Sequence, residues 1–257
     1  MSIYEHFRPE ERPLIEHFLD LRDQAARRYQ QRLTDFLDPR EQQILKSLIG
    51  NDQEIHLQFS GGYSGAERCR ALLYPVFDQP EANSFRLTCF DVQYPQKFTT
   101  LTHPELLGAL MGTGVDRRKV GDLLFDENRA QFVCANEIED YMMLNLVSVG
   151  KSRVRLIPID PASIIHSDQN WQENEGTVSS LRLDTVLSEI YHLSRTKAAE
   201  KIDHGLVKVN WQPMSKHDYE LAEGDVLSLR GSGRSKIISA SSLTKKHKIR
   251  LHYGKLD

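Results

Sequence analysis

The sequence predicts an α+β protein with several domains. Three observations lead to this prediction: apolar residues at helical spacing near the start, short strand-like runs alternating with helical ones from about residue 70, and a last third with its own charge balance. The 257 residues, 39% of them apolar, suffice for two or three small folded domains. We therefore divide the chain into a first unit (1–68), a middle domain (69–160), a linker (161–179) and a C-terminal domain (180–257).

Apolar side chains at helical spacing mark the first unit. These residues are Leu14, Phe18, Leu21, Ala25 and Tyr29. Their spacing predicts one long helix over residues 10–36. The Asp38-Pro39 pair then interrupts the helix, because a residue before proline avoids helical backbone angles. We expect a second helix over 40–48, a strand over 54–60 and a glycine-rich turn over 60–65. The first unit is thus helical with a small β component.

Strands and helices alternate in the middle domain. A strand is expected at 70–77, followed from Phe85 onward by the order strand, helix, strand, strand, helix, strand. These elements are placed at 85–92, 102–111, 122–125, 131–135, 137–149 and 153–159. The βαββαβ order is typical of the ferredoxin-like arrangement, in which helices cover one face of a sheet. The polar residues 161–179 show no sustained period and are expected to form a linker.

Two short amphipathic helices open the C-terminal domain. The first is predicted by one apolar stripe, made of Leu183, Val186, Leu187 and Ile190. The second is expected from Arg195 to His204, with Ser194 as its N-terminal cap and with Lys197, Lys201 and His204 on one face. Two strands follow, at 206–210 and 226–230. Two helices on a short sheet with cations around them form a platform that suits a phosphate backbone.

The charge of the chain is divided unevenly. Residues 1–179 hold 19 Lys and Arg against 27 Asp and Glu, whereas residues 180–257 hold 14 against 9, so a net charge of −8 stands beside one of +5. A local basic block on patterned sequence fits either a folded surface that meets phosphate or an ordinary solvated face.

The sequence predicts no catalytic residue, cofactor or metal. Cys69, Cys89 and Cys134 are odd in number, far apart and set among apolar or strand-like neighbours, so we expect buried reduced thiols. Cysteines and histidines do not stand at zinc-ligand spacing. No apolar run approaches the ~20 residues that span a bilayer, and the charged start lacks the apolar stretch of a secretion signal. A cytoplasmic protein without membrane contact is therefore expected.

Four short motifs carry a resemblance to a known domain family. They are Arg182-Leu183-Asp184, Ser194-Arg195, Gly205-x-Val207-x-Val209-Asn210 and Gly224-Asp225-Val226. Over about 180–236 they resemble the S4-type RNA-binding domain, which implies recognition of shaped RNA by a two-helix face. Nearly the whole chain resembles the YlmH family of bacterial proteins encoded near cell-division genes, including the segments 6–11 (His6-Phe7-Arg8-Pro9-Glu10-Glu11) and 33–41.

This resemblance implies a ribosome-associated RNA-binding adaptor rather than an enzyme. The implied partners are the RNA of the large ribosomal subunit and peptidyl-tRNA, in the rescue of obstructed subunits during C-terminal tailing of stalled chains. Protein partners of the quality-control or division machinery are implied as well. A small tailing factor of similar module type uses two arginines for ribosomal RNA, and matching by motif places them at Arg182 and Arg195.

The candidate RNA-binding residues are cations of the basic block and one asparagine. They are Arg182, Arg195, Lys197, Lys201, Lys208, Asn210, Arg230, Arg234 and Lys236. We expect the cations to converge on one face and to contact phosphates, while Asn210 fixes a turn. In the middle domain the cluster Arg117, Arg118 and Lys119 is either solvated or an auxiliary RNA contact.

Two other classes of protein stay open from the sequence. An RNA-modifying enzyme, either a pseudouridine synthase or a ribosomal RNA methyltransferase, can carry the same module, although the module then usually precedes the catalytic domain. Gly112-Thr113-Gly114 does not fit a methyl-donor or dinucleotide loop, because it follows a helix and Arg117 stands where the third glycine belongs. The other alternative is a division-site adaptor that contacts proteins through its acidic first 179 residues.

Overall fold

The computed structural model describes residues 7, 11–50, 52–96, 99–126, 129–165, 171–243 and 248–256. The chain forms two compact units, Met1–Ser167 and Asp168–Asp257, and each is described here by itself. Most of the segment 6–11 that carried part of the family resemblance lies outside the described residues, as do residues 166–170 of the expected linker.

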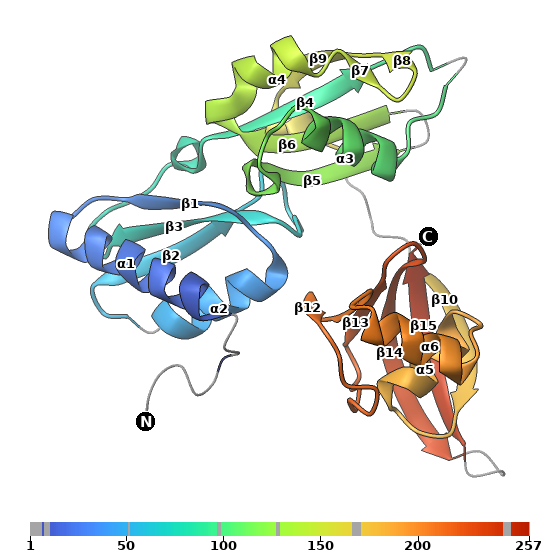
Figure 1. Cartoon of the computed structure of the whole chain (residues 1–257). Helices are drawn as coiled ribbons and strands as arrows, with labels where there is room; N and C mark the ends of the chain where they lie inside the picture. Colours follow the sequence, from blue (N-terminus) through green and yellow to red (C-terminus); the bar gives the residue numbers. More distant parts are fainter. Residues whose placement is uncertain are drawn as a thin grey trace. The chain divides into compact units, whose positions relative to one another are not determined.

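The first sheet has three strands and is covered by two helices. In chain order they are α1 (Arg12–Arg28), β1 (Arg32–Leu37), α2 (Pro39–Ile49), β2 (Ile55–Ser60) and β3 (Cys69–Pro75). The strand order is β1-β3-β2, and both pairings are antiparallel. Apolar residues of α1 and α2 pack with those of the three strands in one core, which places both helices on the same face of the sheet (Figure 1). Asp38 begins α2 through a capping box with Glu41.

The prediction of one helix over 10–36 is wrong beyond Arg28. The helix ends there because Tyr29 adopts left-handed backbone angles, with φ at 51°. The chain then turns into β1, whose residues pair with β3. Leu33 and Phe36 continue the helical spacing of the apolar residues, so the pattern alone did not separate strand from helix.

The pairing of β3 differs from the expected division of the chain. The sequence boundary at 68/69 placed the strand 70–77 in the middle domain, whereas β3 lies at the centre of the first sheet, between β1 and β2. The hydrophobic run of β3, with Ala71, Leu72 and Leu73 all buried, is explained by this central position.

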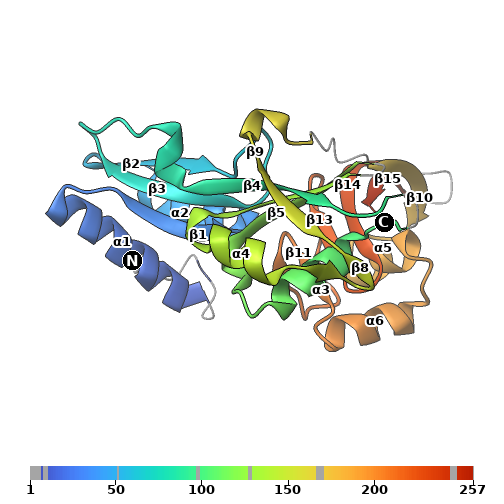
Figure 2. The same ribbon diagram turned by 90° about the horizontal axis from the view of Figure 1, so that it is seen from above.

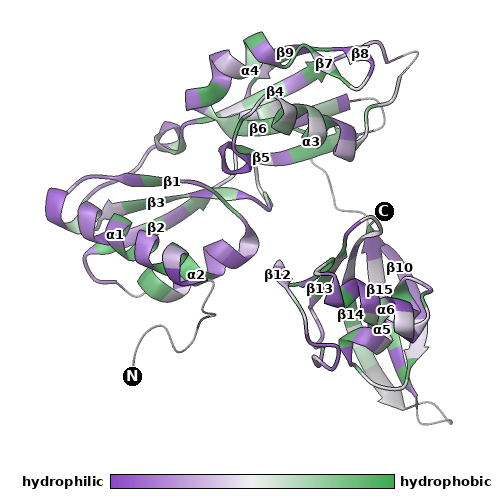
Figure 3. Cartoon of the chain, viewed as in Figure 1, coloured by the Kyte–Doolittle hydropathy of each residue, from purple (hydrophilic) through white to green (hydrophobic). Residues whose placement is uncertain are grey.

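The middle sheet has the expected ferredoxin-like order. Its elements are η3 (Ala82–Phe85), β4 (Leu87–Gln93), α3 (His103–Gly112), η4 (Arg117–Lys119), β5 (Val120–Asp126), β6 (Arg129–Ala135), η5 (Asn136–Ile138), α4 (Glu139–Asn145), β9 (Arg155–Ile159) and η6 (Pro161–Ser163). The strands run in the order β5-β6-β4-β9 with antiparallel neighbours, and α3 and α4 share one core on one face (Figure 2). The central strands β4 and β6 are largely hydrophobic in Figure 3, because residues pack on both of their faces.

The helix predicted over 137–149 is shorter in the structure. It starts with the 3-10 turn η5, continues as α4 and ends at Asn145. A two-stranded hairpin of β7 (Ser148–Val149) and β8 (Ser152–Arg153) follows, and Gly150 in its turn has a φ of 57°. A backbone angle of this kind suits glycine and gives the hairpin its tight turn.

The C-terminal unit is a six-stranded sheet with two helices. Its elements are β10 (Gln172–Val178), α5 (Leu183–Ile190), α6 (Arg195–Asp203), β11 (Val207–Val209), β12 (Gln212–Pro213), β13 (Val226–Leu229), β14 (Gly233–Leu243) and β15 (Ile249–Leu256). The strand order is β10-β15-β14-β13-β11-β12. Residues 172–178 of the expected linker are therefore a strand, paired along its length with β15. No helix among the described residues is long and apolar enough to cross a membrane.

Candidate nucleic-acid interface

Arg182 and Arg195 stand at the beginnings of the two helices of the C-terminal unit. Arg182 is the N-terminal cap of α5, and its guanidinium donates two hydrogen bonds to the carboxylate of Asp184, at 3.1 and 3.0 Å. The guanidinium lowers the pKa of Asp184 below its ordinary value. Arg195 opens α6 and donates to the hydroxyl of Ser179 at 2.8 Å. Both arginines are exposed, but only Arg182 pairs with a carboxylate of its own domain among the described residues.

The outer side of α6 carries two lysines. Lys197 and Lys201 are four residues apart and so lie on the same side of the helix, while Ala198 and Ile202 are buried in the core. In the part of the chain that the structure describes, neither lysine takes part in an ion pair with a carboxylate. Ser194 caps the helix by accepting from the backbone N–H of Lys197 at 3.2 Å. The cationic helix side predicted from the spacing is therefore present in the structure.

Three other candidate cations lie on the opposite face of the sheet. Val207 and Val209 belong to the core shared with α5 and α6, so Lys208 between them points away from the helices. The same alternation applies to Arg234 and Lys236, which lie on either side of the buried Ser235. Lys208, Ser228 and Arg234 are opposite one another on β11, β13 and β14.

The expected convergence of the cations on a single face is therefore wrong. The helix side carries Arg182, Arg195, Lys197 and Lys201, and the far face of the sheet carries Lys208, Arg234 and Lys236. Arg230 is exposed in the loop between β13 and β14. The alternation of Val207, Lys208 and Val209 was visible in the sequence, but the side of Arg234 and Lys236 depends on β14, a strand that was not predicted.

Arg250 on β15 is a cation of the far sheet face that the candidate set lacks. It is exposed, and it alternates with Leu251, which is fully buried in the core. His252 lies on the same face and pairs with Glu173 of β10 at 3.1 Å. The alternation of apolar and charged residues from Ile249 to Tyr253 was the available signal for this strand.

Asn210 has an intramolecular role in the structure. The turn Asn210-Trp211 joins β11 to β12, and both residues have positive φ, 48° and 65°. The amide of Asn210 donates to Asp225 at 2.8 Å and accepts from the backbone N–H of Val226 at 2.9 Å. The side chain thus ties the two-residue turn to the start of β13, as the expected turn-fixing role requires.

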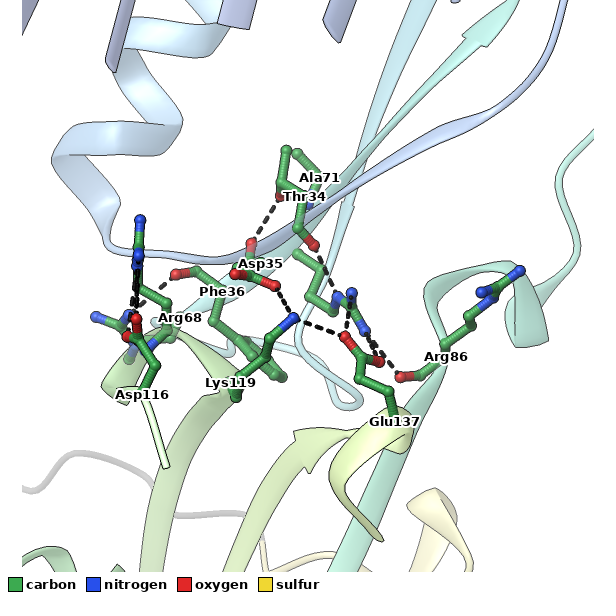
Figure 4. Close-up of polar contacts among 11 residues, drawn as sticks. Thr34, Asp35, Phe36, Arg68, Ala71, Arg86, Asp116, Lys119 and Glu137 are labelled. Carbon is green, nitrogen blue, oxygen red and sulfur yellow. Dashed lines mark hydrogen bonds and ion pairs between the residues drawn. The ribbon is translucent and has the colours of Figure 1, made fainter. Parts of the chain in front are cut away.

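The basic cluster of the middle domain has partners inside the protein, and Figure 4 shows those of Lys119. Arg117 donates to the carbonyls of Val120 and Gly121, and burial lowers its pKa to about 10. Arg118 pairs with Asp116 at 3.0 Å. Lys119 bridges Asp35 of β1 at 2.6 Å and Glu137 of η5 at 3.0 Å, so it connects the first and middle sheets. An RNA contact through the exposed Arg118 stays a prediction.

All three cysteines are free and buried, as expected from their neighbours. Burial raises the pKa of the Cys69 and Cys89 thiols to about 11 and raises the pKa of Cys134 further. Thiols of this kind are neutral near pH 7 and act as small apolar side chains.

Three family models match the chain. Residues 10–76 match the N-terminal region of YlmH, residues 80–163 match the putative RNA-binding domain in YlmH, and residues 181–227 match the S4 domain. The first two matches meet between β3 and η3, in agreement with the pairing of β3 in the first sheet.

Two known proteins resemble the chain over most or all of their length. A Bacillus subtilis (strain 168) protein named ribosome-associated protein quality control protein P2 is 41% identical over 252 residues, which are 98% of each chain. The solved structure of the cell division protein ylmH from Streptococcus pneumoniae is 30% identical with a TM-score of 0.55, covering 64% of this chain and 99% of that one. The resemblance inferred from the motifs is confirmed, and the chain belongs to the YlmH family.

Proposed function

We propose that this chain is a non-catalytic adaptor that binds folded RNA of the large ribosomal subunit together with peptidyl-tRNA. The C-terminal domain supplies the contact, and the adaptor acts in the rescue of obstructed subunits during C-terminal tailing. The name of the Bacillus subtilis relative supports the ribosomal setting, and the S4 match supports RNA as the ligand.

The helix side of the C-terminal unit is the observation that carries this proposal. Arg195, Lys197 and Lys201 are cations on a helix capped by Ser194, and none of them is paired with a carboxylate among the residues described. A phosphate therefore meets these groups without first displacing a carboxylate. Arg182 differs, because an approaching phosphate must compete with Asp184 for its guanidinium.

The proposal is tested by co-sedimentation of the full chain with isolated large ribosomal subunits. With about four phosphate contacts, the log–log slope of affinity against salt is about −3, so binding weakens by roughly 60-fold between 50 and 200 mM salt. The variant Arg195→Glu/Lys197→Glu should lose binding at the lower salt concentration. Lys46→Glu, a single charge reversal on the exposed side of α2, should bind as the wild type does. Equal binding of all three proteins would reject the helix side as the contact.

An enzymatic role is tested in the same preparation. An RNA methyltransferase binds S-adenosylmethionine, so equilibrium dialysis of the full chain against that compound, and against ATP, separates an adaptor from a methyltransferase or an ATP-dependent enzyme. We expect no specific low-micromolar binding of either compound. Such binding would overturn the adaptor proposal in favour of an enzyme.

A further inference from the structure

A cavity of about 540 Å³ lies beside β1 and β3 and is lined by three arginines. Its lining comes from the first sheet and from the middle domain. The lining residues are Gln31, Arg32 and Leu33 at β1, Arg70 and Leu72 of β3, and Ser84, Arg86, Asn136 and Glu137 of the middle domain. The volume falls within the range of small-ligand sites, which is about 300–1,000 Å³. Three guanidinium groups against one carboxylate give the lining a net positive charge.

The three arginines differ in the hydrogen bonds and ion pairs that their guanidinium groups make. Arg70 is 4% exposed and holds the Glu137 carboxylate through two hydrogen bonds, at 3.0 and 3.1 Å. Both oxygens of Glu137 are thereby used, and one of them also accepts from Lys119. The carboxylate is therefore already neutralised before any ligand arrives.

The guanidinium of Arg86 is available to bind an anionic ligand. Its backbone carbonyl accepts from Arg70 at 3.1 Å, but its guanidinium has no ion-pair partner in the described chain and is directed away from Glu137 (Figure 4). Its φ of 47° is an unusual backbone conformation for a non-glycine residue. Arg32 is half-buried and bonds only to neutral groups, among them the amide oxygen of Gln24 at 3.0 Å. The hydrogen bond to Gln24 of α1 directs the Arg32 guanidinium to the helix-covered face of the sheet, so Arg86 is the lining arginine without a carboxylate partner among the described residues.

An exposed aromatic pair lies beside the same end of the first sheet. Tyr29 and Phe77 are 71% and 70% exposed, and their ring centroids are 6.0 Å apart. Tyr29 precedes the cavity residue Gln31 by two positions, roughly 7 Å along an extended chain. Gln31 also donates to Asp78, the neighbour of Phe77, at 2.9 Å. Exposed aromatic side chains and a guanidinium without a carboxylate partner are components of sites for single-stranded RNA.

We propose that this cavity receives a phosphate of a single-stranded RNA segment at Arg86, while an adjacent base stacks on the Tyr29–Phe77 pair. The proposal rests on the RNA-binding function proposed above and adds a second contact to it. An acidic peptide would also satisfy Arg86, but it would leave the aromatic pair unused. The aromatic pair therefore favours RNA.

The test uses the full chain and a fluorescein-labelled oligouridylate of 12 nucleotides. In fluorescence anisotropy, Arg86→Glu and Tyr29→Ala/Phe77→Ala should each weaken binding about tenfold, as expected for one charge-assisted contact or one stacked base. Loss of the one phosphate contact in Arg86→Glu should reduce the magnitude of the salt slope by about 0.7. Lys46→Glu is the control, because Lys46 lies on α2, which covers the other face of the first sheet. A circular dichroism melt of each variant verifies that it is folded.

Two outcomes would overturn the proposal. One is unchanged affinity and slope in Arg86→Glu and in the aromatic double variant. The other is displacement of the RNA by polyglutamate in the wild type with no requirement for Tyr29 or Phe77, which would assign the cavity to acidic peptides. Neither outcome affects binding to large subunits through Arg195 and Lys197, so failure here is distinguishable from failure of the proposed function.

Discussion

Arg70 of β3 and Glu137 of η5 form a two-hydrogen-bond ion pair that joins the first sheet to the middle sheet. The Arg70 side chain is 5% exposed, while that of Glu137 is 39% exposed. Lys119 adds a second bridge from Glu137 to Asp35. These charged side chains therefore join the two sheets of residues 1–167, beside the apolar cluster that holds Phe36 of β1 and Val133 of β6.

Removal of the Arg70 side chain should lower the stability of the compact unit Met1–Ser167. Arg70→Met leaves the carbonyls of Thr34 and Arg86 without their guanidinium donor, and the expected loss is about 2–4 kcal/mol in the free energy of unfolding. Urea unfolding of the full chain measures it. The matched control is Arg129→Met, because Arg129 and Asp126 are each about half exposed, so the expected loss is below about 0.5 kcal/mol. Equal losses in the two variants would contradict the bridging role.

Acid should weaken the same bridge. Burial alone would raise the pKa of Glu137, but hydrogen bonds from Arg70 and Lys119 outweigh it and lower the pKa to about 2. Because the folded-state pKa is below the unfolded-state value near 4.5, the stabilisation is complete above about pH 4.5 and is lost as the pH falls toward 2. Wild type should therefore lose more stability between pH 5 and pH 3 than Glu137→Gln does. Parallel losses in urea unfolding at the two pH values would show that Glu137 does not titrate in this range.

Asn210 should act on the fold of the C-terminal unit rather than on RNA directly. Asn210→Ala removes two side-chain hydrogen bonds and places alanine at positive φ, for an expected cost of about 2–3 kcal/mol. Asn210→Gly should cost less, because glycine adopts that φ without strain. Hydrogen–deuterium exchange of peptides covering 207–230 measures the change. Faster exchange in the glycine variant than in the alanine variant would argue against the turn as its cause.

The two cationic faces of the C-terminal unit should differ in their effect on binding to large subunits. Arg195→Glu/Lys197→Glu alters the helix side, and Lys208→Glu/Lys236→Glu makes the same charge change on the far sheet face. We expect the helix-side variant to weaken binding at least tenfold more than the sheet-face variant. The reason is that the helix side holds three cations, Arg195, Lys197 and Lys201, on the single capped helix α6. Equal weakening, measured by co-sedimentation, would instead require RNA on both faces.

Local patterns in the sequence predicted the middle sheet and the S4-type helices well. The apolar stripe from Leu183 to Ile190 lies within one helix, so the sequence shows it directly. The first strand, β1, was missed because Leu33 and Phe36 fit helical spacing as well as a strand. The environment of Lys119 depends on Asp35, 84 residues away, and no local pattern encodes such a pair.

Ultraviolet crosslinking of the intact protein to RNA in cells, with the crosslinked peptides and RNA positions mapped, asks whether the C-terminal unit contacts the RNA. We expect crosslinked peptides from the helix side, residues 179–204, joined to RNA of the large ribosomal subunit or to tRNA. Crosslinks to ribosomal RNA or tRNA that exclude every peptide from 171–256 would contradict this expectation.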